Sequence, residues 1–469
     1  MNNQRFLLLG LIIIFLSGCT LAPEYTRPTA PIPAEWPSGP AYEDTLAEPG
    51  APAASAIHWR QFFPDLRLQK LIETALQNNL DLRAAALNVE RALAVYGIRR
   101  VELLPTVDAA ASYYKARIPV DISGNEDTPT IEQFDVNLGI TSWEIDFFGR
   151  LRSLKDKALE EYFATEQGRR SAQISLVSGV AGVYLVYASD RERLKLAEST
   201  LAAQEASYNL IRRRYEVGLA GELDLRQAQT RADAARVDVA RFTRLVAQNE
   251  NALNLLVGST VPSELLPEDL SSVGLRGDIS PGISSEVLLR RPDILQAENL
   301  LKAANANIGA ARAAFFPRIS LTAVFGTASG DLSRLFRPGQ DAWTFAPQIV
   351  MPIFDARTWW ALKATKVDRE IAVTQYQKTI QTAFREVADA LAMNGTVDDQ
   401  LAAQESLVHA SSETYRLSNA RYLKGIDNFL VVLDSQRSLY EAQQGLITVN
   451  LARLGNQVKL YAVLGGGAD

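Results

Sequence analysis

The sequence predicts a mainly α-helical protein with a smaller β part, built as two tandem repeats. Three observations predict this fold class. Two long stretches, 130–261 and 353–469, contain no proline and are rich in Ala, Leu, Gln, Glu and Arg, which are good helix formers. Four short segments alternate apolar and polar residues, as half-buried strands do. The second half of the chain also repeats the pattern of the first half.

Composition narrows the class of function. A net charge of -6 and a pI near 5.4 argue against a nucleic-acid-binding protein, which would carry a basic stripe. One cysteine excludes an internal disulfide, and two histidines with one cysteine argue against a soft-metal site. His58 and His409 are isolated in the sequence, so we expect them to be structural or exposed. The chain has no P-loop, no G-x-G-x-x-G after a strand and no G-x-S-x-G. We therefore predict no enzyme activity, no cofactor and no metal.

The first eighteen residues have the layout of a secretory signal peptide. Arg5 precedes an apolar run, residues 6–16, which is about half the length needed to span a bilayer. Leu-Ser-Gly-Cys at 16–19 then resembles the bacterial lipobox, in which the leader is cut before the cysteine. Cys19 is therefore the expected lipidation site, carrying S-diacylglycerol and N-palmitoyl groups that together anchor stably. The alternative is an unlipidated export signal with an incidental cysteine. Thr20, in place of an aspartate that would signal inner-membrane retention, favours the outer membrane.

Proline placement and self-similarity divide the mature chain. Asp81 matches Asp293 and Pro105 matches Pro317, about 210 residues apart, as expected of a tandem duplication. We predict five segments: a signal peptide (1–18), a lipidated extended segment rich in Pro, Ala and Ser (19–64), a first repeat (65–258), a connector (259–285), and a second repeat with the C-terminal tail (286–469).

Each repeat has the same predicted inner plan. In the first repeat, a helix over 65–103 precedes two strands, and a helix over about 150–215 follows them. At 1.5 Å per residue the second helix would be roughly 100 Å long. After a turn near Gly218, a return helix covers 223–257. Helices this long must pack sideways against one another to bury their apolar stripes.

The strand-like segments are 106–116, 134–141, 319–325 and 343–354. The alternation slips near Ser142, which a β-bulge would explain. Each segment is near the length of a tilted membrane-crossing strand, although a sheet of a soluble protein is the alternative. Strands cross lipid only as closed barrels, of which the smallest have about eight strands. If these strands span the membrane, four per chain are too few, so several copies must pool them, and three copies would supply twelve.

Together with the lipobox, several longer motifs resemble those of the TolC-like outer membrane efflux proteins, and specifically the lipoprotein branch that partners RND pumps. They occur in the family's order and cover most of the mature chain. One departure follows the last strand: many relatives have a Gly-Gly-Arg-like run where this chain has Ala-Arg-Thr-Trp-Trp at 356–360. The motifs include WRQFFPDLRLQKLIETALQNNLDLRAA (59–85), WEIDFFGRLR (143–152), RRPDILQAE (290–298), AFFPRISLT (314–322) and ARYLKGIDNFLVVLDSQRSLYEAQQ (420–444).

The resemblance implies a passive exit duct in the outer membrane of a Gram-negative bacterium. A homotrimer would form a 12-stranded transmembrane β-barrel, four strands per chain, continued by a long antiparallel α-helical barrel in the periplasm. The periplasmic end would stay nearly closed until an inner membrane RND pump and a periplasmic adaptor protein dock. The sequence does not define the cargo, so drugs, metals, solvents and peptides remain open.

Two Tyr-x-x-Gly turns end the long helices of the two repeats. Gly218 and Gly425 suit the left-handed conformation that follows a helix end. Tyr215 and Tyr422 precede them by three residues, and we expect these tyrosines to hydrogen-bond across neighbouring helices.

The residues just after these turns are the predicted periplasmic gate. Leu430 and Asp434 are four residues apart, so they share a helix face. In the family's pattern this face points toward the pore axis, where a leucine ring resists ion flow and an acidic ring favours cations. Asp427 adds charge or pairs with a neighbouring helix, and Leu223 and Asp224 occupy the sister turn. The alternative is that Leu430 seals a helix–helix seam and Asp434 is a solvated surface charge.

Two other functions fit parts of the sequence. The same duct could serve a type I secretion system, but the lipobox weighs against it because many such ducts lack one. A different class is a lipid-anchored coiled-coil scaffold of the envelope, whose strands never enter the membrane.

Overall fold

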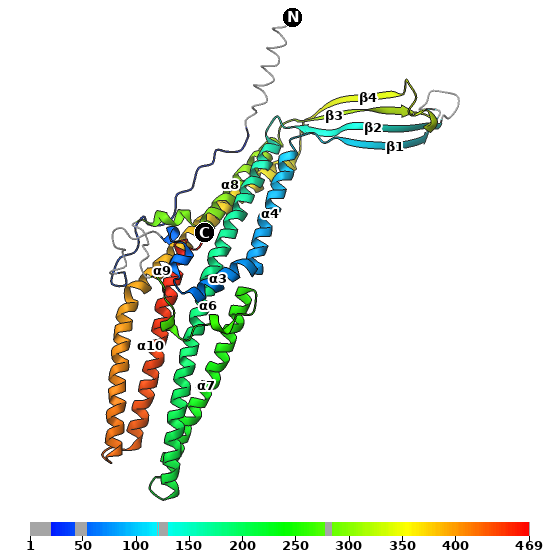
Figure 1. Cartoon of the computed structure of the whole chain (residues 1–469). Helices are drawn as coiled ribbons and strands as arrows, with labels where there is room; N and C mark the ends of the chain where they lie inside the picture. Colours follow the sequence, from blue (N-terminus) through cyan, green and yellow to red (C-terminus); the bar gives the residue numbers. More distant parts are fainter. Residues whose placement is uncertain (1–19, 43–53, 120, 122–129, 277–283, 469) are drawn as a thin grey trace. The chain divides into compact units, whose positions relative to one another are not determined.

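The computed structural model describes residues 20–42, 54–119, 121, 130–276 and 284–468. Cys19 and the predicted signal peptide lie outside the described residues. The element order runs through the same plan twice, helix–strand–strand–long helix–return helix (Figure 1). The helices are α2 (Trp59–Phe62), α3 (Leu66–Asn78), α4 (Leu80–Val101), α6 (Arg150–Glu216), α7 (Glu222–Val257), α8 (Pro292–Ala313), α9 (Ala356–Leu423) and α10 (Phe429–Val463), and the strands are β1 (Asp108–Arg117), β2 (Thr130–Ile145), β3 (Arg318–Ser329) and β4 (Asp341–Val350).

The chain forms two compact units, and each unit draws on both repeats. Among the described residues, those within Met1–Thr29, Asn88–Thr165 and Gln296–Tyr376 form the sheet unit. Those within Ala30–Leu87, Glu166–Leu295 and Gln377–Asp469 form the helical unit. The division falls within the helices α4, α6, α8 and α9.

The four strands of the sheet unit form one antiparallel sheet in the order β1-β2-β3-β4 (Figure 1). The register shifts between Ile140 and Trp143, so the predicted irregularity near Ser142 is confirmed. β1 and β4 are the edge strands, and within the described part of the chain neither pairs with a further strand. The sheet therefore has two open edges.

The predicted long helices are confirmed. Helix α6 has 67 residues and helix α9 has 68, far longer than ordinary globular helices. Among the described residues, α6 alone contains a window apolar and long enough to cross a membrane, and half of that window is buried within the protein. Sideways packing accounts for this apolar character, as it does in any core helix.

The single helix predicted over 65–103 is wrong, because the chain breaks it at Asn79. This residue has an extended conformation, with φ -63° and ψ 125°. Its side chain accepts a hydrogen bond from the backbone N–H of Leu82 at 2.9 Å and donates one to the carbonyl of Leu256 at 3.0 Å. Asn79 thus caps α4 and ties the break to the end of α7. These two side-chain hydrogen bonds compensate for the backbone hydrogen bonds that are lost where the helix is interrupted.

An aromatic cluster closes the core of the helical unit. Phe62 stacks on Tyr461 with ring centroids 4.0 Å apart, and Phe63 packs edge-on against Phe62 at 4.7 Å. All three side chains are buried, and the Tyr461 hydroxyl donates to the carbonyl of Ile57 at 2.7 Å. The WRQFF motif and the C-terminal helix are therefore held together by stacking and by one buried hydrogen bond.

The described part of the connector packs against the same unit. The backbone N–H of Arg276 donates to the carbonyl of Phe62 at 3.0 Å, and the Arg67 guanidinium donates to the carbonyl of Ser272 at 3.1 Å. Leu270 is buried, and its backbone N–H donates to Glu192 of α6 at 3.3 Å. The described part of the connector therefore packs against α2, α3 and α6.

Replacing Asn79 by alanine removes both the cap of α4 and the link to α7. We expect Asn79→Ala to destabilise the protein by about 1–2 kcal/mol, the usual cost of losing a cap. The midpoint of thermal unfolding of the detergent-solubilised protein, followed by circular dichroism, measures the loss. Asn78→Ala, at the exposed neighbouring position, is the matched control. Equal midpoints for the two variants would contradict the capping role.

Candidate passage, gate and anchor sites

The two faces of the sheet differ in chemistry. Directly opposed residues on paired strands share a face, so the register sorts the side chains. One face is polar and small, and there Ser112 donates to Asp135 at 3.3 Å and Thr141 donates to Asp108 at 3.2 Å. The other face is apolar, and its members include Val136, Leu138, Ile140, Ile319, Leu321, Ala323, Phe325, Trp343, Phe345 and Ile349.

The apolar face is exposed. Trp343 is exposed over 74% of its surface, Ile349 over 68% and Phe325 over 63%. A contiguous apolar face of this kind marks a lipid or protein contact in soluble and membrane proteins alike. The opposite face, with its hydroxyl and carboxylate groups, suits water. This division is the one a barrel strand shows, with apolar residues toward lipid and polar residues toward a lumen.

Ion pairs and hydrogen bonds stabilise the junction between β2 and α6. The charged residues of the WEIDFFGRLR motif form these contacts. Glu144 accepts two hydrogen bonds from the Arg150 guanidinium, each 2.8 Å long. The Asp146 carboxylate accepts from the backbone N–H groups of Leu151 at 3.1 Å and Arg152 at 2.8 Å, which caps the first turn of α6. The last residues of the strand therefore fix the start of the long helix.

Residues 20–27, which we call the strap, lie along the helices of the sheet unit. Thr20 and Ser153 of α6 form a hydroxyl–hydroxyl bond of 3.1 Å. On α8, Arg312 donates to the carbonyl of Leu21 at 3.0 Å, and Asn305 donates to the carbonyl of Pro23 at 2.7 Å. The strap thus begins beside the α6 and α8 ends that join the strands β2 and β3.

A glycine makes the close approach of the strap possible. A Cβ atom on Gly309 of α8 would lie 2.7 Å from the backbone nitrogen of Ala22. Any larger side chain at this position would therefore push the strap away from the helix.

Glu298 of α8 holds the other end of the strap. The residue is 3% exposed, and its carboxylate accepts from Arg27 at 3.1 and 2.5 Å and from the Tyr25 hydroxyl at 3.2 Å. Lys302 lies 3.4 Å from the same carboxylate. Burial by itself raises the pKa of the Glu298 carboxyl, but the Arg27 hydrogen bonds and the charges of Lys302 and Arg27 outweigh burial, so its pKa lies below the ordinary 4.5. Glu298 is therefore an ionised clamp.

In the helical unit, the two Tyr-x-x-Gly turns have the same geometry. Gly218 and Gly425 have φ of 77° and 72°, the left-handed conformation that the sequence predicts. The N–H of Gly218 donates to the carbonyl of Tyr215, and that of Gly425 donates to the carbonyl of Tyr422, both at 2.9 Å. The following residue in each turn donates back to the carbonyl five positions earlier, which completes a Schellman motif.

The helix ends near these turns pack on one hydrophobic cluster. Its buried members come from α6, α7 and α10, and Tyr422 of α9 packs against it. Tyr422 also accepts a hydrogen bond from Arg214 of α6 at 2.8 Å, so the predicted bond across helices forms at this tyrosine. Tyr215, its counterpart in the first repeat, is exposed over 41% of its surface. The buried members are Ile211, Ala228, Phe429, Val432 and Leu433.

The predicted gate residues Leu430 and Asp434 lie on one exposed face of α10. Leu430 is 54% exposed, whereas its neighbours Phe429 and Val432 belong to the buried cluster. Leu430 therefore does not seal a seam within this chain. Asp434 is also exposed, and Arg437 donates to its carboxylate at 2.6 Å.

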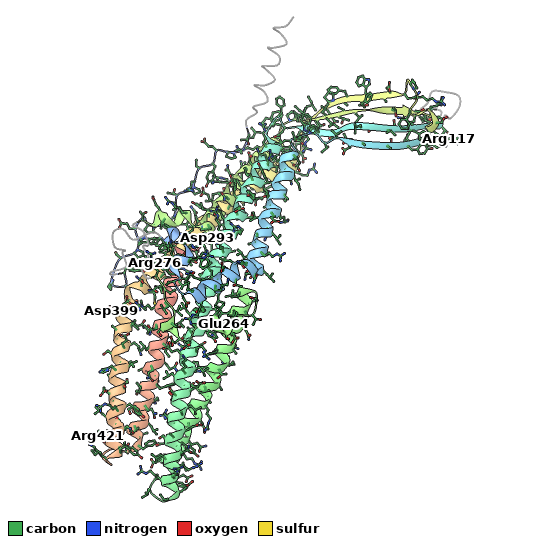
Figure 2. The ribbon with its side chains drawn as sticks, in the orientation of Figure 1. Arg117, Glu264, Arg276, Asp293, Asp399 and Arg421 are labelled. Atoms are coloured by element: carbon green, nitrogen blue, oxygen red, sulfur yellow. The ribbon has the colours of Figure 1, made fainter. Side chains whose placement is uncertain are left out.

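The two other acidic candidates for the gate have local partners. Arg421, labelled in Figure 2, donates to both oxygens of Asp427 at 2.6 and 2.9 Å. This hydrogen-bonded pair lowers the pKa of the Asp427 carboxyl. In the sister turn, Leu223 is exposed, and Asp224 accepts from the backbone N–H of Gly221 at 3.3 Å and so caps α7. Asp427 thus pairs across its own turn, and the structure gives Asp224 a capping role.

Sequence reasoning missed the partners of these residues. Arg437 follows Asp434 at the i,i+3 spacing of helical ion pairs, a signal that could have predicted the contact. Arg27 and Glu298 are 271 residues apart, and no local pattern connects them. His58 caps α2 by accepting from the backbone N–H of Arg60 at 3.2 Å. Across the described ranges, no three His, Cys, Asp or Glu side chains are grouped as a metal site would require.

Comparison with known proteins gives the same picture of the fold. A family model described as outer membrane efflux protein matches residues 71–259 and again 283–466. The chain is 48% identical over 467 residues to the "Toluene efflux pump outer membrane protein TtgC" of Pseudomonas putida, covering 99% of this chain and 96% of that protein. It is 41% identical over 461 residues to the "Outer membrane protein OprJ" of Pseudomonas aeruginosa, covering 98% and 95%.

Solved structures match over nearly the whole chain. The open state of the MtrE outer membrane channel of Neisseria gonorrhoeae superposes with a TM-score of 0.86 at 36% identity, covering 96% of this chain and 99% of that one. A membrane protein from Pseudomonas aeruginosa superposes with a TM-score of 0.87 at 40% identity, covering 95% and 100%. The chain therefore shares the fold of known outer membrane channels.

The hydrogen bonds and ion pairs of the Glu298 carboxylate make the free energy of unfolding depend on pH in the acid range. Because its pKa is depressed in the folded chain, the ionised carboxylate contributes fully above the unfolded value near 4.5, and the contribution is lost as pH falls through the folded value. At neutral pH we expect Glu298→Gln to cost about 1.5–3 kcal/mol, as for other hydrogen bonds to buried charges. Thermal unfolding midpoints of wild type and variant should converge as the pH falls through the depressed pKa of the Glu298 carboxyl.

Glu24→Gln is the control for this experiment, since Glu24 is an exposed carboxylate of the strap. Its midpoint should follow that of the wild type at every pH. A gap between Glu298→Gln and wild type that stays constant through the acid range would show that Glu298 is not held as an ion.

Proposed function

Because the chain belongs to the outer membrane efflux protein family, we propose that three copies form a passive exit duct of a tripartite, RND-type efflux system. The chain is an outer membrane transport protein and not an enzyme. In the proposed assembly, a twelve-stranded barrel crosses the outer membrane and a helical tunnel leads to it from the periplasm.

The observation that carries this proposal is the four-stranded sheet. It exposes an apolar face, it has a polar opposite face, and both of its edges are open. In hydrocarbon each unpaired backbone group costs several kcal/mol, so the edges need partner strands. Pairing β4 of one copy with β1 of the next satisfies both edges of every chain. Three copies give twelve strands, within the range of known outer membrane barrels.

The gate of the duct is proposed at the helix turns of the helical unit. Leu430 and Asp434 are exposed on one face of α10, which is the face expected to line the pore. Three copies would place a ring of leucines next to a ring of aspartates. Arg437 adds a positive charge beside each aspartate, so the ring is only partly anionic.

Three contacts near the turns would hold this end in its observed arrangement. Arg214 binds Tyr422, and Arg421 binds Asp427. Tyr440 of α10 donates to Asp238 of α7 at 3.0 Å, and burial followed by the nearby Asp238 charge raises the pKa of Tyr440 to about 12, which keeps the hydroxyl protonated. Docking of a periplasmic adaptor and an inner membrane pump would open the gate by separating these helices.

The lipid anchor is proposed at Cys19. Support comes from the strap, since Thr20 lies beside Ser153 near the start of α6, immediately after the strand–helix junction. Acyl chains on the preceding residue would enter the bilayer next to the barrel. S-diacylglycerol and N-palmitoyl groups together anchor far more firmly than a single chain.

The proposed repeats, 65–258 and 286–469, rest on the two family matches at 71–259 and 283–466. The intervening segment, 259–285, is the proposed equatorial connector. Relatives are named as outer membrane proteins of toluene, solvent and antibiotic efflux pumps. An efflux pump component, rather than a type I secretion duct, is therefore the function these names favour. The pump that delivers the cargo would determine what is exported.

Single-channel recording tests the duct and its gate together. The purified chain should insert into planar bilayers as trimers of low conductance. Leu430→Ala should raise the conductance by widening an apolar constriction, and Asp434→Asn should lower the cation selectivity measured from the reversal potential in a salt gradient. Arg437→Gln should raise that selectivity, because it removes the neighbouring positive charge.

Leu255→Ala is the matched control, since Leu255 is an exposed leucine of α7 remote in sequence from the turns. It should conduct as the wild type does. Wild-type conductance and selectivity in all three gate variants would remove Leu430 and Asp434 from the gate. Monomeric protein without any conductance would refute the duct itself.

Lipidation is tested by the mass of the mature protein. The protein purified from membranes should carry the mass of three acyl chains and a glycerol on Cys19, and Cys19→Ser should lose this mass and retain the leader. The strap residues are unchanged in this variant, so bilayer conductance of the refolded protein should persist. Masses of the wild type and Cys19→Ser that differ only by the replacement of sulfur with oxygen would contradict the anchor.

A further inference from the structure

The first turns of α9 combine tryptophan and basic side chains, all of them within the sheet unit. Trp359 is 68% exposed and Trp360 is 67% exposed, although Trp359 rests edge-on against Phe315 with ring centroids 4.9 Å apart. Large apolar side chains are rarely left at a free surface in pairs. This is also the place where the sequence departs from the Gly-Gly-Arg-like run of many relatives. The set Arg357, Trp359, Trp360, Lys363 and Lys366 is called the α9 anchor segment below.

The anchor segment continues the apolar face of β4. Trp343 and Ile349 lie on that face, and Met351 and Ile353 keep the same alternation beyond the end of the strand. Ile353 is 90% exposed. The exposed apolar surface therefore runs from the strand, through its end, to the start of α9 without a buried interruption.

The length of β4 determines where the exposed apolar surface would emerge from the hydrocarbon core of the bilayer. Its ten residues, at about 3.4 Å each and tilted by about 40°, cross roughly 25 Å, which is the height of the apolar band of an outer membrane barrel. Trp343 lies near the beginning of the strand, and the tryptophan pair follows its end. Tryptophans thus bracket the span at both ends, as they do at the two interfaces of a bilayer.

The charges of the segment suit lipid phosphate. Residues 351–367 contain three basic side chains and one acidic one, Asp355. Asp355 is neutralised by Arg357, which donates to its two oxygens at 2.9 and 2.8 Å. Lys363 lies 5.1 Å from the centroid of the Trp360 ring, a cation–π distance that leaves its ammonium group at the surface. Long basic side chains beside tryptophan reach the headgroup layer while the rings stay in the interface.

We propose that the α9 anchor segment binds the phospholipid headgroup layer on the periplasmic side of the outer membrane, with Trp359 and Trp360 in the interface and Lys363 and Lys366 at the phosphates. This inference rests on the proposed duct, because the duct places the apolar face of β4 in lipid. The other possible occupant is a neighbouring copy of the chain. Lipid is favoured over that contact because residues 356–367 carry three basic side chains and no acidic one, a charge balance that suits anionic phosphate.

Depth-dependent quenching of tryptophan emission tests the proposal. The full-length chain is reconstituted into vesicles of phosphatidylethanolamine and phosphatidylglycerol that contain lipids brominated either near the headgroup or near the chain ends. The emission lost in Trp359→Phe/Trp360→Phe, measured as a difference from wild type, belongs to the pair. This difference emission should be quenched more by bromine near the headgroup than by bromine near the chain ends. Lys363→Gln/Lys366→Gln should reduce that quenching.

Two outcomes would overturn the proposal. Difference emission that no brominated lipid quenches would mean that a neighbouring copy covers the pair. Stronger quenching near the chain ends would place the pair inside hydrocarbon. The single variant Trp360→Phe gives the same comparison if the double variant does not assemble.

Trp343→Phe separates this proposal from the duct. Its difference emission should be quenched by brominated lipid whenever the apolar face of β4 is in the membrane. If Trp343 is not quenched and no conductance is seen, the duct proposal fails. If Trp343 is quenched and the pair is not, only the anchor proposal fails.

Discussion

The hydrogen-bonding needs of the two edge strands govern this molecule. β1 and β4 are the outer strands of a four-stranded sheet, and the sheet exposes an apolar face that includes Trp343 and Ile349. Water tolerates open edges but disfavours such a face, whereas lipid tolerates the face but not the edges. Closure with further copies satisfies both requirements at once. The long helices have a parallel requirement, because their apolar stripes must be buried by packing side by side.

Hydrogen bonds and ion pairs at the strand–helix junction and along the strap determine the local geometry of the sheet unit. Glu144 with Arg150, and Asp146 at the first turn of α6, fix the direction in which the helix leaves the strand. The strap crosses the same region, held by Ser153 at one end and by the buried Glu298 carboxylate at the other. The ion pair of the junction forms between residues close in sequence, whereas the strap is held by the buried Glu298 carboxylate, and both define a geometry where apolar packing alone would permit several.

Periodic features could be predicted from the sequence, and long-range contacts could not. The long helix at 150–215, the irregularity near Ser142 and the glycine turn at Gly218 each depend on residues close together in the chain. The break at Asn79 was missed because its side chain bonds to the carbonyl of Leu256, 177 residues away. The clamp at Glu298 was missed for the same reason, because Arg27 lies 271 residues before it. The roles of Leu430 and Asp434 remain proposals, although the structure exposes both on one helix face.

The two Schellman turns show what covalent fusion of the repeats permits. Their backbones are alike, but one carries the Arg421–Asp427 pair, and the other uses Asp224 to begin its return helix. In a ring of six identical short chains, any change at one turn would occur at all six. Joining two copies in one polypeptide halves the symmetry, so evolution can adjust alternate positions around the ring independently. The side chains of one set of hairpins can then change while those of the other set stay the same.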